Sequence, residues 1–253
     1  IILMENKEIY ITDRIFILKN QLFYESDNGK IKFNKNNWHK YIIDYGFEKL
    51  EMGWRKRLKS ENSKNSLWGV LDCGGDGDCL FLCIEEAFKN FYTPENDDFS
   101  AEKIRDYAAN QIDKINFELI LTTYKLEEET GEFLGEWEPS KINTIEELQT
   151  EIRKMGNSFW GDHTIIQLLE QALNINIILL NSENEFFENL KYKIQSRGNK
   201  FYNDRRTIIL YYYLNCHFQL IGYFNGNKMQ TIFTFEQLPK ELKKVCKEDL
   251  NLA

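Results

Sequence analysis

The chain has 253 residues, 42% of them hydrophobic, with only 3 Pro and 14 Gly. This length and composition favour a sizeable buried core and argue against a collagen-like or disordered chain. The formal net charge of -8 argues against a nucleic-acid partner, because nucleic acids attract basic surfaces. Basic side chains are in excess over residues 1–70 and acidic ones beyond, so a downstream binding surface is expected to favour a basic partner.

The five cysteines are few and show no repeated spacing, which is unlike a disulfide framework and predicts a reducing, cytoplasmic compartment. We expect no membrane contact, because the sequence lacks an apolar run of about 18 residues. Residues 1–4 and the charged residues after them lack the basic-then-apolar pattern of a signal peptide. A chain that begins with Ile is expected to have been trimmed, so a leader that has been removed stays an alternative. Richness in Lys, Asn and Ile indicates an AT-rich genome, such as that of a virus or an intracellular bacterium, and then the compartment is the host cytoplasm.

An accessory extension is predicted over residues 1–60. Residues 21–25 and 30–33 are strand-like and flank a segment that contains Asn28-Gly29, which predicts a hairpin with a type I′ turn. Residues 55–65 are polar and basic and are interpreted as a linker.

Strands and helices alternate in the remainder, which predicts an α/β or α+β core. Residues 125–140 are acidic and are predicted to be an exposed loop. We expect helices beginning at Cys79 and after Ser100, and over residues 144–154, 162–173 and 236–250. We expect strands near residues 68–73, 175–180, 207–214, 218–224 and 230–235.

Cys79 is the candidate nucleophile. A thiolate is the attacking species, and the free N–H groups at a helix start lower the pKa of a thiol. The preceding Gly-rich loop, residues 74–77, is suited to aim backbone N–H groups at an oxyanion. On its own, however, a cysteine at a helix start is more often structural.

The same segment contains residues that could suggest two kinds of metal site. A calcium loop starting at Asp72 would need Glu at its twelfth position, which is Cys83. A zinc site made of Cys73, Cys79, Cys83 and His217 would lack a Cys-x-x-Cys pair. Neither pattern is therefore favoured.

Only three histidines are available as a general base. His39 lies beside Trp38 in the extension and is interpreted as a surface residue, while His163 follows Trp160-Gly161-Asp162 at a predicted helix start. His217 follows a predicted strand, and a sheet would hold it still.

Three blocks of sequence resemble the ovarian tumour (OTU) family of cysteine proteases. They are Asp76-Gly77-Asp78-Cys79-Leu80-Phe81, the run from Phe159-Trp160-Gly161-Asp162 to Leu180, and His217-Phe218-Gln219-Leu220. The resemblance spans residues 66–225, with residues 226–253 left as a C-terminal strand and helix. It implies a papain-like core of OTU type, in which a small central sheet lies between helical layers, behind an N-terminal hairpin-containing extension.

The resemblance also implies a deubiquitinase, which cleaves after the C-terminal glycine of ubiquitin, polyubiquitin or a ubiquitin-like protein. By position, Cys79 is the nucleophile, His217 is the base, and Asp76 belongs to the catalytic set. The backbone of Asp76, Gly77 and Cys79 would form the oxyanion hole. Trp160 either walls the substrate site or packs in the core. No cofactor and no metal are implied.

The third member of the triad stays open. Many members of the family carry Asp or Asn two residues after the histidine, and this chain has Gln219 there. Asp76, Gln219 and Asn215 are the candidates. Because the neutral Gln219 would stabilise an imidazolium less than a carboxylate does, a catalytically weak or inactive ubiquitin-binding module is one alternative function. Another papain-like cysteine hydrolase is a second alternative, disfavoured by Trp160-Gly161.

Overall fold

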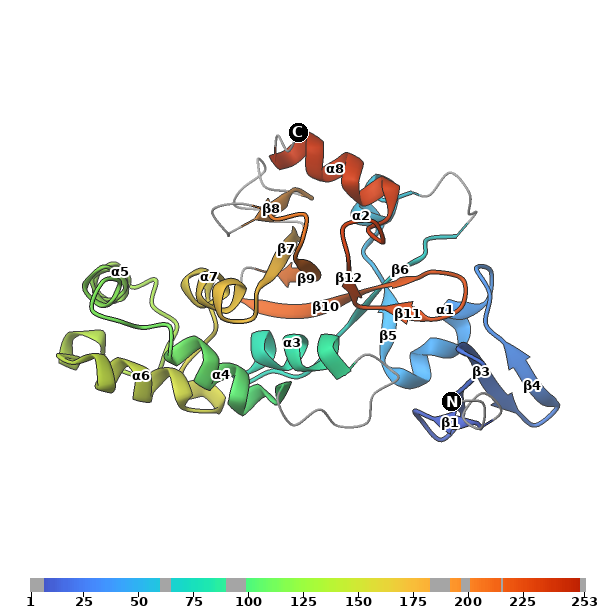
Figure 1. Cartoon of the computed structure of the whole chain (residues 1–253), viewed down its shortest axis with the longest axis horizontal. Helices are drawn as coiled ribbons and strands as arrows, with labels where there is room; N and C mark the ends of the chain where they lie inside the picture. Colours follow the sequence, from blue (N-terminus) through green and yellow to red (C-terminus); the bar gives the residue numbers. More distant parts are fainter. Residues whose placement is uncertain are drawn as a thin grey trace.

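The structure is a computed structural model of the chain, and it describes residues 7–59, 65–89, 99–182, 192–196, 201–214 and 216–250. Two sheets are present, a small one near the N-terminal end and a larger one that runs through the middle of the molecule (Figure 1). The strands of the small sheet are antiparallel throughout. In order, they are β1 (Ile9–Tyr10), β2 (Ile15–Leu18), β3 (Gln21–Ser26) and β4 (Gly29–Lys32).

The predicted hairpin is confirmed as β3 and β4, but the predicted type I′ turn is wrong. The turn residues are Asp27 and Asn28, neither of which has a positive φ, and the positive φ of 117° falls on Gly29. A pair with positive φ joins β2 to β3 instead, at Lys19 (50°) and Asn20 (60°). Those values match the turn that a two-residue hairpin loop favours.

The larger sheet has the strand order β5-β6-β10-β9-β7-β8, with β11 paired to β10 and β12 paired to β9. Its pairings are antiparallel except for β7 with β9. The strands are β5 (Phe47–Lys49), β6 (Trp68–Leu71), β7 (Ile175–Asn181), β8 (Ile194–Ser196), β9 (Arg206–Tyr213), β10 (His217–Phe224), β11 (Met229–Gln230) and β12 (Ile232–Phe233).

Helices cover both faces of this sheet (Figure 1). The helical segments are α1 (Trp38–Tyr41), η1 (Ile42–Tyr45), α2 (Met52–Arg57), α3 (Cys79–Lys89), α4 (Ala101–Ala109), α5 (Phe117–Thr130), η3 (Pro139–Lys141), α6 (Ile145–Arg153), η4 (Gly156–Ser158), α7 (His163–Ala172) and α8 (Lys240–Leu250). None of these described helices combines the length and hydrophobicity that a membrane crossing needs.

Successive side chains of β7 pack against the helices on opposite faces of the larger sheet. Ile177 and Leu179 pack with α3, α4 and α7, whereas Ile178 and Leu180 pack with α2 and α8. Side chains of a strand alternate between faces, so a strand covered on both sides reads as one continuous apolar run. The predicted fold class, a central sheet between helical layers, is confirmed.

Two expectations about loops are wrong. The predicted linker over residues 55–65 overlaps α2, and Leu58 is fully buried after it; residues 60–64 lie outside the described residues. The predicted loop over residues 125–140 overlaps α5, which continues to Thr130 and ends at Gly131 with a φ of 76°. Glutamates are good helix formers, so an acidic run extends this helix rather than breaking it.

The extension is joined to the rest through several elements. β5 pairs with β6, and Trp54 of α2 is buried and donates its indole N–H to Asn181 O at 2.7 Å. Arg57 binds Asp249 of α8 at 2.9 Å, and the same carboxylate accepts from Ile194 N. The boundaries at residues 60, 66 and 225 stay predictions.

Trp54→Ala should lower the free energy of unfolding by about 3–5 kcal/mol, because it empties a large buried site and leaves Asn181 O without its donor. Met52→Ala on the same helix is the control, since Met52 is 59% exposed and its loss should change stability by less than about 0.5 kcal/mol. Urea denaturation of both variants measures this. Equal stabilities would contradict a structural role of α2 in the core between the larger sheet and α8.

Candidate active site

The loop before α3 has an unusual backbone. Asp76 has a φ of 56° and Gly77 a φ of 83°, and consecutive left-handed residues turn successive N–H groups toward one side. Within the described residues, the N–H groups of Asp76 and Gly77 make no hydrogen bond. A Cβ on Gly77 would lie 2.2 Å from Gly156 O, so only glycine fits there. This geometry agrees with an oxyanion hole built from the loop.

A buried arginine holds the loop in place. Arg105 of α4 is fully buried and donates to Asp78 Oδ1 at 2.9 Å, and also to Gly77 O at 3.2 Å. The second oxygen of Asp78 accepts from Gly156 N at 2.8 Å. Further bonds run from Arg105 to Ile152 O and Phe159 O. The loop, α4 and the segment before α7 are thereby locked together.

Cys79 is the first residue of α3 and is 3% exposed. Burial raises the pKa of its thiol, while hydrogen bonds from the backbone of Phe218, Leu80 and Cys79 itself lower it. The expectation that the helix start lowers the pKa is therefore outweighed by burial. Cys83, one turn further along α3, donates its thiol to Phe218 O at 3.4 Å, so α3 packs against the start of β10, next to His217.

His217 is the first residue of β10, and its Nε2 lies 3.2 Å from Asp72 Oδ1. The same oxygen of Asp72 accepts from Gly74 N at 3.0 Å, which fixes the carboxylate. Within the described residues, Asp72 is the one hydrogen-bond or ion-pair partner of the ring.

The residues proposed from the sequence for the third position lie elsewhere. Asp76 is exposed, and within the described part of the chain no hydrogen bond or ion pair joins Asp76 or Gln219 to the His217 ring. Asn215 lies outside the described residues. Sequence reasoning considered Asp72 only as a calcium ligand, because its approach to His217 depends on the pairing of β6 with β10. Asp76 in the catalytic set stays a prediction.

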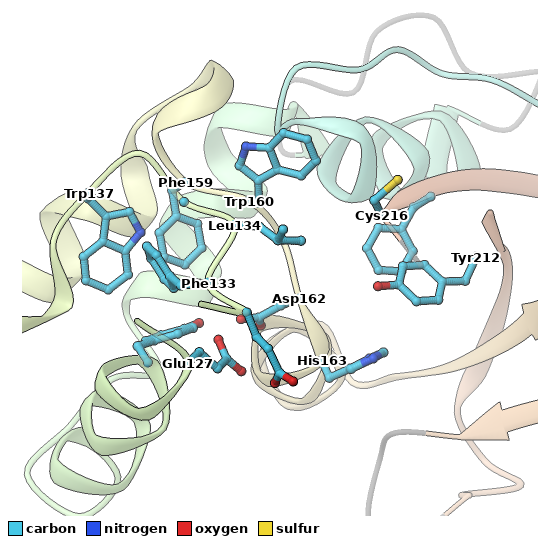
Figure 2. A pocket seen from close by; sticks show the side chains of 15 residues that line it. Glu127, Phe133, Leu134, Trp137, Phe159, Trp160, Asp162, His163, Tyr212 and Cys216 are labelled. Atoms are coloured by element: carbon cyan, nitrogen blue, oxygen red, sulfur yellow. The ribbon is translucent and has the colours of Figure 1, made fainter. Parts of the chain in front are cut away.

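A cavity of about 500 Å³ opens beside these residues (Figure 2). It lies between α5 with its following loop, the segment that leads into α7, and the adjoining ends of β9 and β10. Its lining residues are Tyr124, Glu127, Glu132, Phe133, Leu134, Gly135, Trp137, Phe159, Trp160, Gly161, Asp162, His163, Tyr212, Cys216 and Phe218. Aromatic and acidic side chains thus dominate a space that reaches Phe218, the residue after His217.

Carboxylates of the cavity face one another. Burial raises the pKa of Glu127, and the neighbouring charges of Asp162 and Glu132 raise it further. Burial also raises the pKa of Asp162, although the bond from Ile165 N at the start of α7 opposes this. A cationic group in the cavity would relieve the repulsion among these carboxylates.

Trp160 and Gly161 line the cavity. Trp160 is partly exposed and donates its indole N–H to Asn157 O at 3.1 Å, which fixes the ring (Figure 2). A Cβ on Gly161 would lie 2.6 Å from Leu80 Cδ2, so glycine lets this segment pack against the first turn of α3. The role of Trp160 in substrate binding stays a prediction.

Comparison with known families agrees with this arrangement. The family model described as OTU-like cysteine protease matches residues 74–218, more than half of the chain. The chain belongs to the OTU-like cysteine protease family. The predicted resemblance is therefore confirmed, and Cys79, Trp160 and His217 all lie inside the range that matches this OTU-like model.

Several solved OTU structures are similar to the chain at low sequence identity. An OTU deubiquitinase from Wolbachia pipientis wMel bound to ubiquitin is 16% identical, covering 64% of this chain and 99% of that chain, with a TM-score of 0.42. The Hazara virus OTU bound to ubiquitin is 10% identical, covering 87% of this chain and 97% of that chain, with a TM-score of 0.36. No curated protein sequence matches the chain.

Arg105→Ala should lower the free energy of unfolding by about 3–5 kcal/mol, because it leaves the Asp78 carboxylate partly buried and without its cation. Arg153→Ala is the control: its pair with Asp106 is 2.7 Å long but solvent-exposed, so its loss should cost less than about 1 kcal/mol. Thermal or urea unfolding compares the two variants. Similar losses for both would contradict the anchoring role of Arg105.

Proposed function

We propose that this OTU-like cysteine protease is a deubiquitinase that hydrolyses the isopeptide or peptide bond after the C-terminal glycine of ubiquitin or of a ubiquitin-like modifier. One observation carries the proposal. Cys79 stands at the N-terminus of α3, and this helix packs against β10, whose first residue is His217: Cys83 Sγ donates to Phe218 O at 3.4 Å.

In the proposed reaction, His217 takes the proton of the Cys79 thiol, and the thiolate attacks the carbonyl carbon of the terminal glycine. The N–H groups of Asp76, Gly77 and Cys79 stabilise the oxyanion of the tetrahedral intermediate. His217 then donates its proton to the leaving amine, and water hydrolyses the thioester. Because burial raises the pKa of Cys79, the thiolate depends on an adjacent imidazolium to form.

The cavity is the proposed binding site for the C-terminal tail of ubiquitin or of the ubiquitin-like modifier. That tail is basic and ends in glycine, and the cavity offers the carboxylates of Glu127, Glu132 and Asp162 among aromatic rings. Gly161 and Phe218 line the same cavity, and Gly161 packs against Leu80, the residue after Cys79. The charge of the cavity and its proximity to the first turn of α3 therefore favour such a tail.

Wild-type protein should form a covalent adduct with a ubiquitin C-terminal propargyl amide, and Cys79→Ala should form none. His217→Ala should slow the hydrolysis of a ubiquitin conjugate by roughly 10²- to 10⁴-fold, as expected for loss of a general base. Intact-mass measurement detects the adduct, and peptide mapping assigns the labelled cysteine.

Cys216 serves as an internal control, because its thiol is exposed and also lines the cavity. Label on Cys216 rather than Cys79 would contradict the proposed nucleophile. A folded wild-type protein that binds ubiquitin without reacting would instead indicate an inactive binding module. Turnover of other acyl substrates alone would indicate a different papain-like hydrolase.

Neutralising the cavity tests the proposed tail site. The double variant Glu127→Gln with Glu132→Gln should raise KM for a ubiquitin conjugate about threefold to tenfold with little change in kcat, and the effect should shrink as salt is added. Glu118→Gln is the control, since Glu118 is exposed on the first turn of the same helix. An unchanged KM in the double variant would reject electrostatic recognition in the cavity.

A further inference from the structure

We propose that Asp72, outside the motif blocks of the family, is the residue that positions His217. The inference rests on the proposed function for its catalytic meaning, but its geometry stands by itself. His217 Nε2 lies 3.2 Å from Asp72 Oδ1, whereas the position two residues after the histidine, where many family members carry Asp or Asn, is Gln219 in this chain.

Strand pairing explains why a carboxylate from β6 reaches this ring. Leu71 pairs with Leu220, so the chain leaves β6 at Asp72 opposite Gln219. His217 and Gln219 are two apart on β10 and share a face, which makes Asp72 a diagonal neighbour of His217. Diagonal neighbours across antiparallel strands lie within reach of long side chains. The end of the adjacent strand β6 thus supplies His217 with a negative charge, which the neutral side chain of Gln219 cannot provide.

A hydrogen bond within its own loop holds the carboxylate of Asp72 in position beside His217. Asp72 Oδ1 accepts from Gly74 N at 3.0 Å, a local turn that Asp and Asn side chains favour. Gly74 has a φ of 124°, a conformation suited to glycine. The loop that carries the proposed oxyanion hole therefore also holds the group that orients the base.

The chemical consequence concerns both ring nitrogens. A carboxylate only accepts hydrogen bonds, so the proton of the neutral ring lies on Nε2 and the lone pair of Nδ1 is free to take the Cys79 proton. Once the ring is protonated, the charge of Asp72 stabilises the imidazolium. The side chain of Asp72 is 58% exposed, so water screens this stabilisation and its loss should be modest.

Asp72→Asn is the informative variant, because asparagine can still accept from Gly74 N and loses only the charge. Three histidines are simple to resolve by NMR, and His217→Ala assigns the signal. Ring ¹⁵N shifts should show the neutral wild-type ring protonated on Nε2, and Asp72→Asn, whose amide can donate as well as accept, should weaken that preference. In turnover of a ubiquitin conjugate, kcat should fall severalfold, KM should hold, and the basic limb of the pH profile should move to lower pH.

Asp13→Asn is the matched control, since Asp13 is exposed in the extension and loses the same charge. A tautomer preference in Asp72→Asn that coincides with that of Asp13→Asn would overturn the proposal, as would a lower kcat without movement of the basic limb. The ¹⁵N measurement of the ring needs no catalysis. Failure of the wild-type protein to react with ubiquitin would therefore reject the proposed function, while the tautomer still decides the role of Asp72.

Discussion

The arrangement of the site depends on one buried charge. Arg105 is fully buried, and its guanidinium lies 4.0 Å from the centre of the Phe81 ring while it binds Asp78 and three backbone carbonyls. A buried charge without a partner costs several kcal/mol, so the segments that supply these oxygens are stable only when assembled around it. Those segments are the loop before α3, the end of α6 and the segment before α7. A single side chain of α4 thus sets the relative position of three parts of the site.

Assembly around Arg105 has consequences for the cavity. Phe159 O binds Arg105, and the ring of Phe159 stacks on Trp137 with centroids 5.8 Å apart. Trp137 lies beyond the end of α5, so the wall that carries Glu132 and Leu134 is connected through these rings to the loop before Cys79. The other wall belongs to the sheet and includes Phe218. The cavity therefore lies between a helical part anchored by Arg105 and a sheet part that carries the histidine.

Features of the site that depend on adjacent residues can be predicted from the sequence, whereas contacts that depend on the pairing of distant strands cannot. The Gly-rich loop, the helix beginning at Cys79 and the strand around Phe218 each follow from a few adjacent residues, and each is confirmed. Asp72 could not be assigned in this way, because its relation to His217 requires the register of two strands separated by most of the chain. Arg105 looks like an ordinary helix residue until α4 is packed. The acidic end of α5 is wrongly predicted as a loop, because charged side chains indicate solvent exposure and do not distinguish a helix from a loop.

The identity of residue 78 now has a physical reason. The resemblance allows Asn or Asp before the nucleophile, and an asparagine could accept from Gly156 N as Asp78 Oδ2 does. It would bring no negative charge to Arg105, whose pKa is lowered by burial and partly restored by Asp78. The guanidinium would then remain charged in an apolar setting with only dipoles around it. Asp78 in the motif and Arg105 on α4 are therefore one unit, and the charged form of the motif is the form that a buried arginine requires.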